Sequence, residues 1–183
     1  MRLVVLVLAA VAAVAVLLYF TQRAPVLPGG ARLAVSSEAF ANGSAIPALY
    51  TCDGSDLSPP VTWSGAPAGT KSFLIVMADP DAPGGVFIHW VVYNVPPNVT
   101  SLPQGVPKAP STPYGLQAVN DFGRIGYGGP CPPPGRPHRY VITVYALDSA
   151  LGLPPGASSR EVISAASSHV LASGSLVGVY GRR

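Results

Sequence analysis

Charged side chains are scarce in this chain of 183 residues. They make up 10% of the sequence, whereas an ordinary soluble domain carries roughly 25%. Without residues 1–30, nine basic residues face eight acidic ones, and the net charge is +1. A nearly neutral chain lacks the clustered basic face that a nucleic-acid-binding protein needs. We therefore expect no nucleic-acid partner.

Motifs of common catalytic and metal sites are also missing. The sequence contains neither the His-Glu-x-x-His pattern of zinc enzymes nor the Gly-x-Ser-x-Gly pattern of serine hydrolases. We expect no bound metal, no other cofactor and no enzymatic activity, with a hydrolase as the enzymatic alternative.

Glycine and proline, in contrast, are abundant, with 20 and 21 residues respectively. They follow no Gly-X-Y period, which excludes a collagen helix, and their number argues against a mainly helical domain. Hydrophobic residues make up 49% of the chain, enough to bury a core, so an intrinsically disordered protein is also excluded.

The amino-terminal segment predicts a membrane anchor. Residues 3–20 are eighteen apolar residues in a row, which as a helix would extend about 27 Å, just enough to cross a bilayer core. We assign residues 1–23 to a signal-anchor, 24–31 to a Pro/Gly tether and 32–183 to one extracytoplasmic domain. A cleaved signal peptide, and hence a secreted protein, is the alternative.

Two cysteines, Cys52 and Cys131, follow the predicted export segment. An even number of cysteines in an exported chain favours a disulfide. Two buried free thiols are the alternative.

The domain itself reads as short strands separated by Pro/Gly clusters. Apolar or alternating runs at 73–77, 87–93 and 138–147 predict strands, and their regular spacing is typical of an antiparallel sandwich or barrel. The pattern Ser158-x-x-Glu161 is a capping box that predicts one helix after it. We expect Gly174 to end this helix and residues 175–180 to form a last strand.

Two proline-stiffened segments carry the polar residues that could form a site. Asp79-Pro80-Asp81-Ala82-Pro83 follows one predicted strand, and His89 lies at the start of the next. The segment 128–137 contains five prolines and leads directly into His138 and Tyr140. Proline fixes φ, so these side chains are presented with little backbone freedom.

These segments resemble the phosphatidylethanolamine-binding protein family, also called Raf-kinase-inhibitor-like proteins. The resemblance rests on DPDAP at 79–83, HWVVYN at 89–94 and GGPCPPPGRPHRY at 128–140, and the segments 50–54 and 57–63 resemble the prokaryotic branch. It implies an antiparallel β-sandwich of Greek-key type with a small anion-binding cavity at one end. The residues that should line this cavity are Asp79, Asp81, Pro83, His89, His138 and Tyr140, with Trp90 and Pro133 as neighbours.

The residue types in such a cavity favour binding of a small anion. Imidazole and tyrosine donors can hold a phosphate or carboxylate, while Asp79 and Asp81 would orient the imidazoles and could meet an ammonium group. A phospholipid head group satisfies both requirements, but acetate, a nucleotide phosphate or a peptide carboxylate remain open. We expect Arg136 and Arg139 either to support the anion site or to be solvated. His169 is expected in the helix, with no role.

The resemblance also implies a second kind of function. Some members of the family are described as serine-protease inhibitors or kinase regulators, so surface loops such as residues 95–113 could contact a protease or a signalling protein. Because a Pro-rich segment is more often an ordinary surface loop, we treat this function as the alternative.

Overall fold

The computed structural model describes residues 30–182. The predicted signal-anchor lies outside the described residues, as do residues 24–29 of the predicted tether. Within residues 30–182, no helix is long and apolar enough to span a bilayer.

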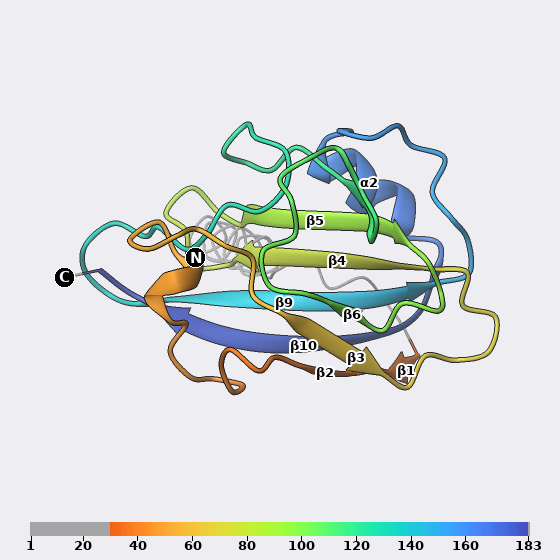
Figure 1. The fold of residues 1–183 in the computed structure, drawn as a ribbon, viewed down its shortest axis with the longest axis horizontal. Coiled ribbons are helices and arrows are strands. Elements are labelled where there is room, and N and C mark those ends of the chain that lie inside the picture. The colour runs from red at the N-terminus through yellow and green to blue at the C-terminus, as the bar shows by residue number, and fades with distance from the viewer. Residues whose placement is uncertain (1–29, 183) are drawn as a thin grey trace, which may run out of the picture.

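Strands dominate the described part of the chain and form two sheets (Figure 1). The larger sheet has seven strands, in the order β1 (Ala31–Arg32), β10 (Val170–Tyr180), β9 (His138–Leu147), β4 (Ser72–Asp79), β5 (Phe87–Val95), β8 (Gly115–Gln117) and β7 (Ser111–Thr112). The smaller sheet has three, in the order β2 (Ala34–Ser36), β3 (Val61–Ser64) and β6 (Ser101–Leu102). All neighbouring strands are antiparallel except β1 and β10.

The larger sheet is covered on both faces, and β4 at its centre shows why the sequence takes this form. All eight residues of β4 are buried. Phe73, Ile75 and Met77 join a core cluster that also contains residues of the smaller sheet, whereas the alternate residues Leu74 and Val76 join a second cluster with helix α2 (Ser159–Ala166). A strand that is buried on both faces reads as a continuous apolar run, as residues 73–77 do.

The prediction of a mostly β fold with one short carboxyl-terminal helix is confirmed for the described residues. The 138–147 strand matches β9 at both ends, and β4 and β5 extend the predicted 73–77 and 87–93 strands by one or two residues at some ends. A single-turn 3-10 helix, η1 (Ala48–Tyr50), completes the regular structure. The Greek-key connection of a sandwich stays a prediction.

The end of the helix was predicted wrongly. Ser158 and Glu161 do form the capping box, but α2 stops at Ala166 and β10 begins at Val170. Gly174 lies inside β10, where a Cβ atom would come within 2.1 Å of the Leu33 carbonyl oxygen. Gly174 therefore allows β10 to approach the Leu33 backbone closely, and it does not end the helix.

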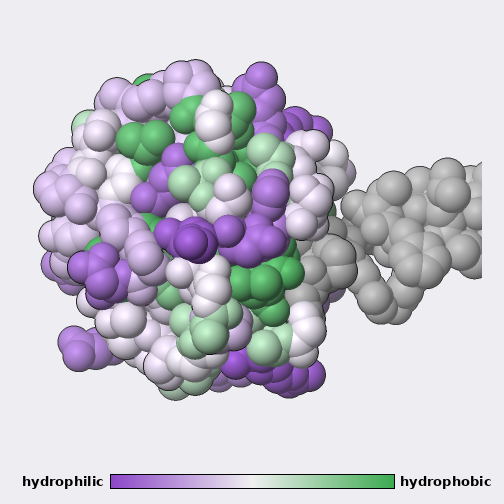
Figure 2. Space-filling model, turned by 90° about the vertical axis from the view of Figure 1, so that its right-hand side faces the viewer, coloured by the Kyte–Doolittle hydropathy of each residue, from purple (hydrophilic) through white to green (hydrophobic). Residues whose placement is uncertain are grey.

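His169 lies between α2 and β10, outside the helix in which we expected it. Its Nδ1 is 2.7 Å from Asp148 Oδ1. Figure 2 shows the end of the molecule opposite the starts of β5 and β9, where hydrophobic side chains form small groups separated by polar ones.

Candidate functional site

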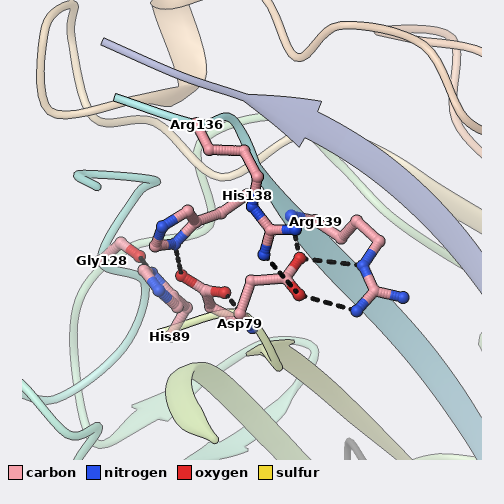
Figure 3. A network of polar contacts seen from close by, with 7 residues as sticks. Asp79, His89, Gly128, Arg136, His138 and Arg139 are labelled. Carbon is pink, nitrogen blue, oxygen red and sulfur yellow. Dashed lines mark hydrogen bonds and ion pairs between the residues drawn. The ribbon is translucent and has the colours of Figure 1, made fainter. Parts of the chain in front are cut away.

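The candidate site lies where three central strands begin or end. The main-chain pairing of β4 with β9 stops at Ala78 and Val141, because Pro80 has no N–H to continue it. Asp79 is the last residue of β4, and His138 is the first residue of β9. His89 lies near the start of β5, so these three residues, widely separated in sequence, meet at one end of the sheet (Figure 3).

A cavity of about 160 Å³ opens at this position. Its lining consists of Asp79, Ala82, Pro83, Phe87, His89, Phe122, Cys131, Pro132, Pro133, His138 and Tyr140. Five of the six positions that the family resemblance implied are among them, and Asp81 is the exception.

Aromatic residues that the sequence did not single out form part of the wall. The Phe87 and Phe122 rings pack edge to face with centroids 4.7 Å apart, and each also contacts the His89 ring, at 5.1 and 5.2 Å. Phe122 lies 33 residues after His89 in a loop, so no spacing pattern could have connected them. The wall excludes water from one side of the imidazole and strengthens polar interactions inside.

Asp79 and His138 form the most buried polar pair of the cavity. The side chains are 5% and 9% exposed, and His138 Nδ1 lies 2.8 Å from Asp79 Oδ2. A carboxylate can only accept, so Nδ1–H of His138 donates. The other oxygen, Oδ1, accepts from the Asp81 backbone N–H at 2.8 Å. Both carboxylate oxygens are therefore already engaged.

His89 is oriented by a carbonyl and not, as expected, by an aspartate. Its Nδ1 lies 2.7 Å from the Gly128 carbonyl oxygen, which can only accept, so Nδ1 carries a proton. Burial lowers the pKa of His89 below its ordinary value, against the opposing effect of the Gly128 carbonyl. The ring is therefore neutral near pH 7, and its Nε2 is a hydrogen-bond acceptor.

Asp81 does not line the cavity, contrary to the expectation, and it orients no imidazole. Its carboxylate accepts from the Arg139 backbone N–H at 2.9 Å, from Nε at 2.8 Å and from a terminal guanidinium nitrogen at 2.7 Å. These contacts draw it away from the cavity toward the opposite face of β9, where alternation along the strand places Arg139. The Arg139 side chain lowers the pKa of Asp81 to about 2.

The Tyr140 hydroxyl is buried and has no hydrogen-bond partner among the described residues, although the whole side chain lines the cavity. Burial, and then the negative charge of Asp79 and the approach of the hydroxyl to the Asp79 carboxylate, raise the pKa of Tyr140 well above its ordinary value. The hydroxyl therefore keeps its proton and can donate it to a ligand.

A disulfide fastens one wall of the cavity. Cys52 and Cys131 are bridged, with their Cα atoms 5.4 Å apart, and Cys131, Pro132 and Pro133 all line the cavity. The Cys52 backbone N–H also donates to the Pro130 carbonyl oxygen at 3.1 Å. Prolines cannot donate such bonds, so the disulfide is an important attachment of this wall.

Neither a metal site nor an interaction loop gains support from the geometry. Residues 30–182 contain no group of three or more His, Cys, Asp or Glu side chains that could hold a metal ion. The segment 95–113 is tied to the body, because Gln117 Nε2 donates to the carbonyl oxygens of Pro107 at 2.6 Å and Ala109 at 2.8 Å. A protease-inhibiting role of this segment stays a prediction.

Comparison with known proteins places these observations in a family. Residues 36–181 match the family model described as phosphatidylethanolamine-binding protein. The chain is 50% identical over 156 residues to the "UPF0098 protein" of Aquifex aeolicus, covering 84% of this chain and 91% of that one. It is 40% identical over 155 residues to LppC of Mycobacterium tuberculosis, whose name describes a candidate lipoprotein, covering 84% and 74% of the two chains.

Solved structures agree with this comparison. The crystal structure of YbcL from E. coli, described as a new member of the mammalian PEBP family, superposes with a TM-score of 0.78 at 35% sequence identity. The match covers 84% of this chain and 100% of YbcL. A phosphatidylethanolamine-binding protein homologue from Chlamydia trachomatis gives a TM-score of 0.75, also at 35% identity and with the same coverage.

Proposed function

The chain belongs to the prokaryotic branch of the phosphatidylethanolamine-binding protein family, and we propose that its cavity binds one small anionic group, with a singly protonated phosphate monoester as the preferred ligand. Three polar groups of the cavity support this proposal. The observation that carries it is the Tyr140 hydroxyl, a buried donor that lies near the Asp79 carboxylate but makes no hydrogen bond to another of the described residues.

Donors and acceptors in the cavity are complementary to a phosphate that retains one proton. Tyr140 supplies an O–H donor. Neutral His89 supplies an acceptor at Nε2, because its Nδ1–H is held by Gly128. His138, whose Nδ1 is held by Asp79, can donate from Nε2 when its ring is protonated. A singly protonated phosphate offers both a hydroxyl for His89 and charged oxygens for Tyr140 and His138.

The size and charge of the cavity favour a head group over a larger ligand. Its volume of about 160 Å³ is well below the ~300–1,000 Å³ of sites for drug-sized molecules. An ammonium group finds few free acceptors, because each oxygen of Asp79 already accepts one hydrogen bond and Arg139 holds Asp81 outside the cavity. We therefore expect the phosphate of phosphoethanolamine, and not its amine, to provide most of the affinity.

We further propose that the domain acts outside the cytoplasm, anchored by its amino-terminal segment. The apolar run at residues 3–20 and the bridged cysteines support an exported domain. The similarity to LppC, whose name describes a candidate lipoprotein, agrees with this location.

Calorimetric titration of the full-length protein in detergent tests the proposed ligand. The probes are inorganic phosphate, O-phosphoethanolamine and sulfate. Sulfate has the shape of phosphate but carries no proton between about pH 5.5 and about pH 8, so it leaves His89 Nε2 facing an unprotonated oxygen. We expect it to bind at least about tenfold more weakly. The affinity for phosphoethanolamine should fall between about pH 5.5 and about pH 8, as the second phosphate proton, with a pKa near 6, is lost.

Matched histidine variants locate the binding. His138→Ala should abolish phosphate binding, whereas His169→Ala should leave it unchanged, because His169 does not line the cavity. Equal affinities for sulfate and phosphate would contradict the proposed hydrogen-bond pattern. Binding that survives His138→Ala would place the ligand elsewhere.

A further inference from the structure

Two side-chain contacts join β4 and β9 beyond the point where their main-chain pairing ends. In the register of the two strands, Ala78 faces Val141 in the last pair. Past this pair, Asp79 contacts His138 and Asp81 contacts Arg139. Only the first contact faces the cavity, since Asp81 and Arg139 are absent from its lining.

The contact between Asp81 and Arg139 is the stronger of the two, and we call it the clamp. Arg139 offers Asp81 two guanidinium hydrogen bonds and one from its own backbone N–H, at 2.7 to 2.9 Å. Paired, charge-assisted bonds of this kind fix orientation as well as position. Arg136, in comparison, lies 3.8 Å from Asp81, and its side chain is 80% exposed.

The clamp is connected to the cavity through one backbone bond. The Asp81 N–H donates to Asp79 Oδ1 at 2.8 Å, which turns Oδ2 toward His138 Nδ1 at 2.8 Å. A chain of hydrogen bonds therefore runs from Arg139 through Asp81 and Asp79 to His138, of which Figure 3 labels Arg139, Asp79 and His138. The last bond determines which ring nitrogen of His138 carries the proton in the neutral form.

We propose that Arg139 is a positioning residue for the anion site. It holds the 79–81 turn so that the Asp79 carboxylate keeps accepting from His138 Nδ1. This contact turns Nε2 into the cavity, where the protonated ring donates to the anion. Arg139 itself does not contact the ligand. The inference rests on the proposed function for its effect on affinity, but its effect on His138 can be measured without any ligand.

Nitrogen-15 NMR of histidine-labelled full-length protein measures the effect of Arg139 on the protonation of the His138 ring. At a pH where the His138 ring is neutral, we expect the proton on Nδ1 in the wild type and a shift of protonation toward Nε2 in Arg139→Gln. Arg136→Gln removes an equal charge nearby but leaves the clamp intact, so its His138 signals should resemble the wild type. Arg139→Lys, which retains the charge and part of the hydrogen bonding, should give an intermediate result.

Phosphate titration of the same proteins gives the second readout. If Arg139→Gln leaves only about one fifth of the molecules in the competent arrangement, phosphate affinity falls about fivefold. Arg136→Gln should change it less than about twofold, as expected for one exposed charge.

The two readouts separate the possible failures. An unchanged His138 tautomer in Arg139→Gln, or equal losses of affinity in Arg139→Gln and Arg136→Gln, would overturn the positioning role. Absence of phosphate binding in the wild type would refute the proposed function, while the tautomer would still decide the role of Arg139. If Arg139→Gln does not fold, the tautomer and affinity of Arg139→Lys decide in its place.

Discussion

Removing the Tyr140 hydroxyl should make the protein more stable and bind phosphate more weakly. In Tyr140→Phe the ring still fills its place among His89 and the core residues, since the His89 and Tyr140 rings lie 5.2 Å apart. Only the oxygen is lost, and this oxygen is buried without a partner among the described residues.

The size of the effect follows from the cost of an unsatisfied polar group. Burying a hydroxyl without a hydrogen bond costs about 1–3 kcal/mol, and the nearby Asp79 charge, which favours the protonated hydroxyl, offsets part of this cost. We expect Tyr140→Phe to raise the free energy of unfolding by about 1–2 kcal/mol. For a chain of this length, that corresponds to an increase in Tm of about 2–8 °C. The affinity for phosphate should fall about tenfold or more, because a hydrogen bond to a charged group is lost.

Thermal unfolding and calorimetric titration of the same samples measure both effects. Tyr93→Phe is the matched control, because the Tyr93 hydroxyl donates to the Pro154 carbonyl oxygen away from the cavity. This control should lose about 1 kcal/mol of stability and keep its phosphate affinity. If Tyr140→Phe lowers the free energy of unfolding as much as Tyr93→Phe does, the Tyr140 hydroxyl already has a good hydrogen-bond partner in the protein. The argument that it serves as a donor to the ligand would then fail.

Three further predictions concern pH and the disulfide. Because the folded protein lowers the pKa of His89, the free energy of unfolding should decline as the pH falls below about 6.5, and urea titrations should show a smaller decline in His89→Gln. Because the pKa of Asp81 is lowered to about 2, a second loss should occur between about pH 4 and about pH 2, and it should be absent when acid unfolding is followed in Arg139→Gln. Replacing both Cys52 and Cys131 by serine opens a loop with a sequence separation of 79 residues and should cost up to about 4–5 kcal/mol in denaturant unfolding; an unchanged midpoint would show that the disulfide does not contribute to stability.

The strands with long apolar or alternating runs could be predicted from the sequence. The start of β10 could not, because its structure depends on residues that are distant in the sequence. The boundaries of β9 follow directly from the residues 138–147. In contrast, residues 170 and 171 fit a helical period locally but lie in β10, where Val170 pairs with Leu147 of β9 and the register shifts before Ala172. Pairing with a neighbouring strand overrides local preference there, and it cannot be read from a short window.

The candidate site was predictable in its residue types more than in its contacts. The resemblance pointed to His89, His138 and Tyr140, and the structure brings them together in one cavity. The sequence could not show that Gly128 holds His89, since a backbone carbonyl leaves no mark on residue identity. It also could not show that Arg139 withdraws Asp81 from the cavity, because neighbouring acidic residues look equivalent until the strand pairing is known.

The complete burial of β4 also determines how a ligand can enter and leave. Its amides lie between β5 and β9 in the middle of the larger sheet, where hydrogen exchange is slowest and local opening is rarest. The opposite side of the cavity is formed by Cys131, Pro132 and Pro133, in a segment whose prolines have no amide protons to bond or exchange. Ligand exchange should therefore be insensitive to the breathing of the sheet, and it should become faster when the Cys52–Cys131 disulfide that fastens this segment is opened.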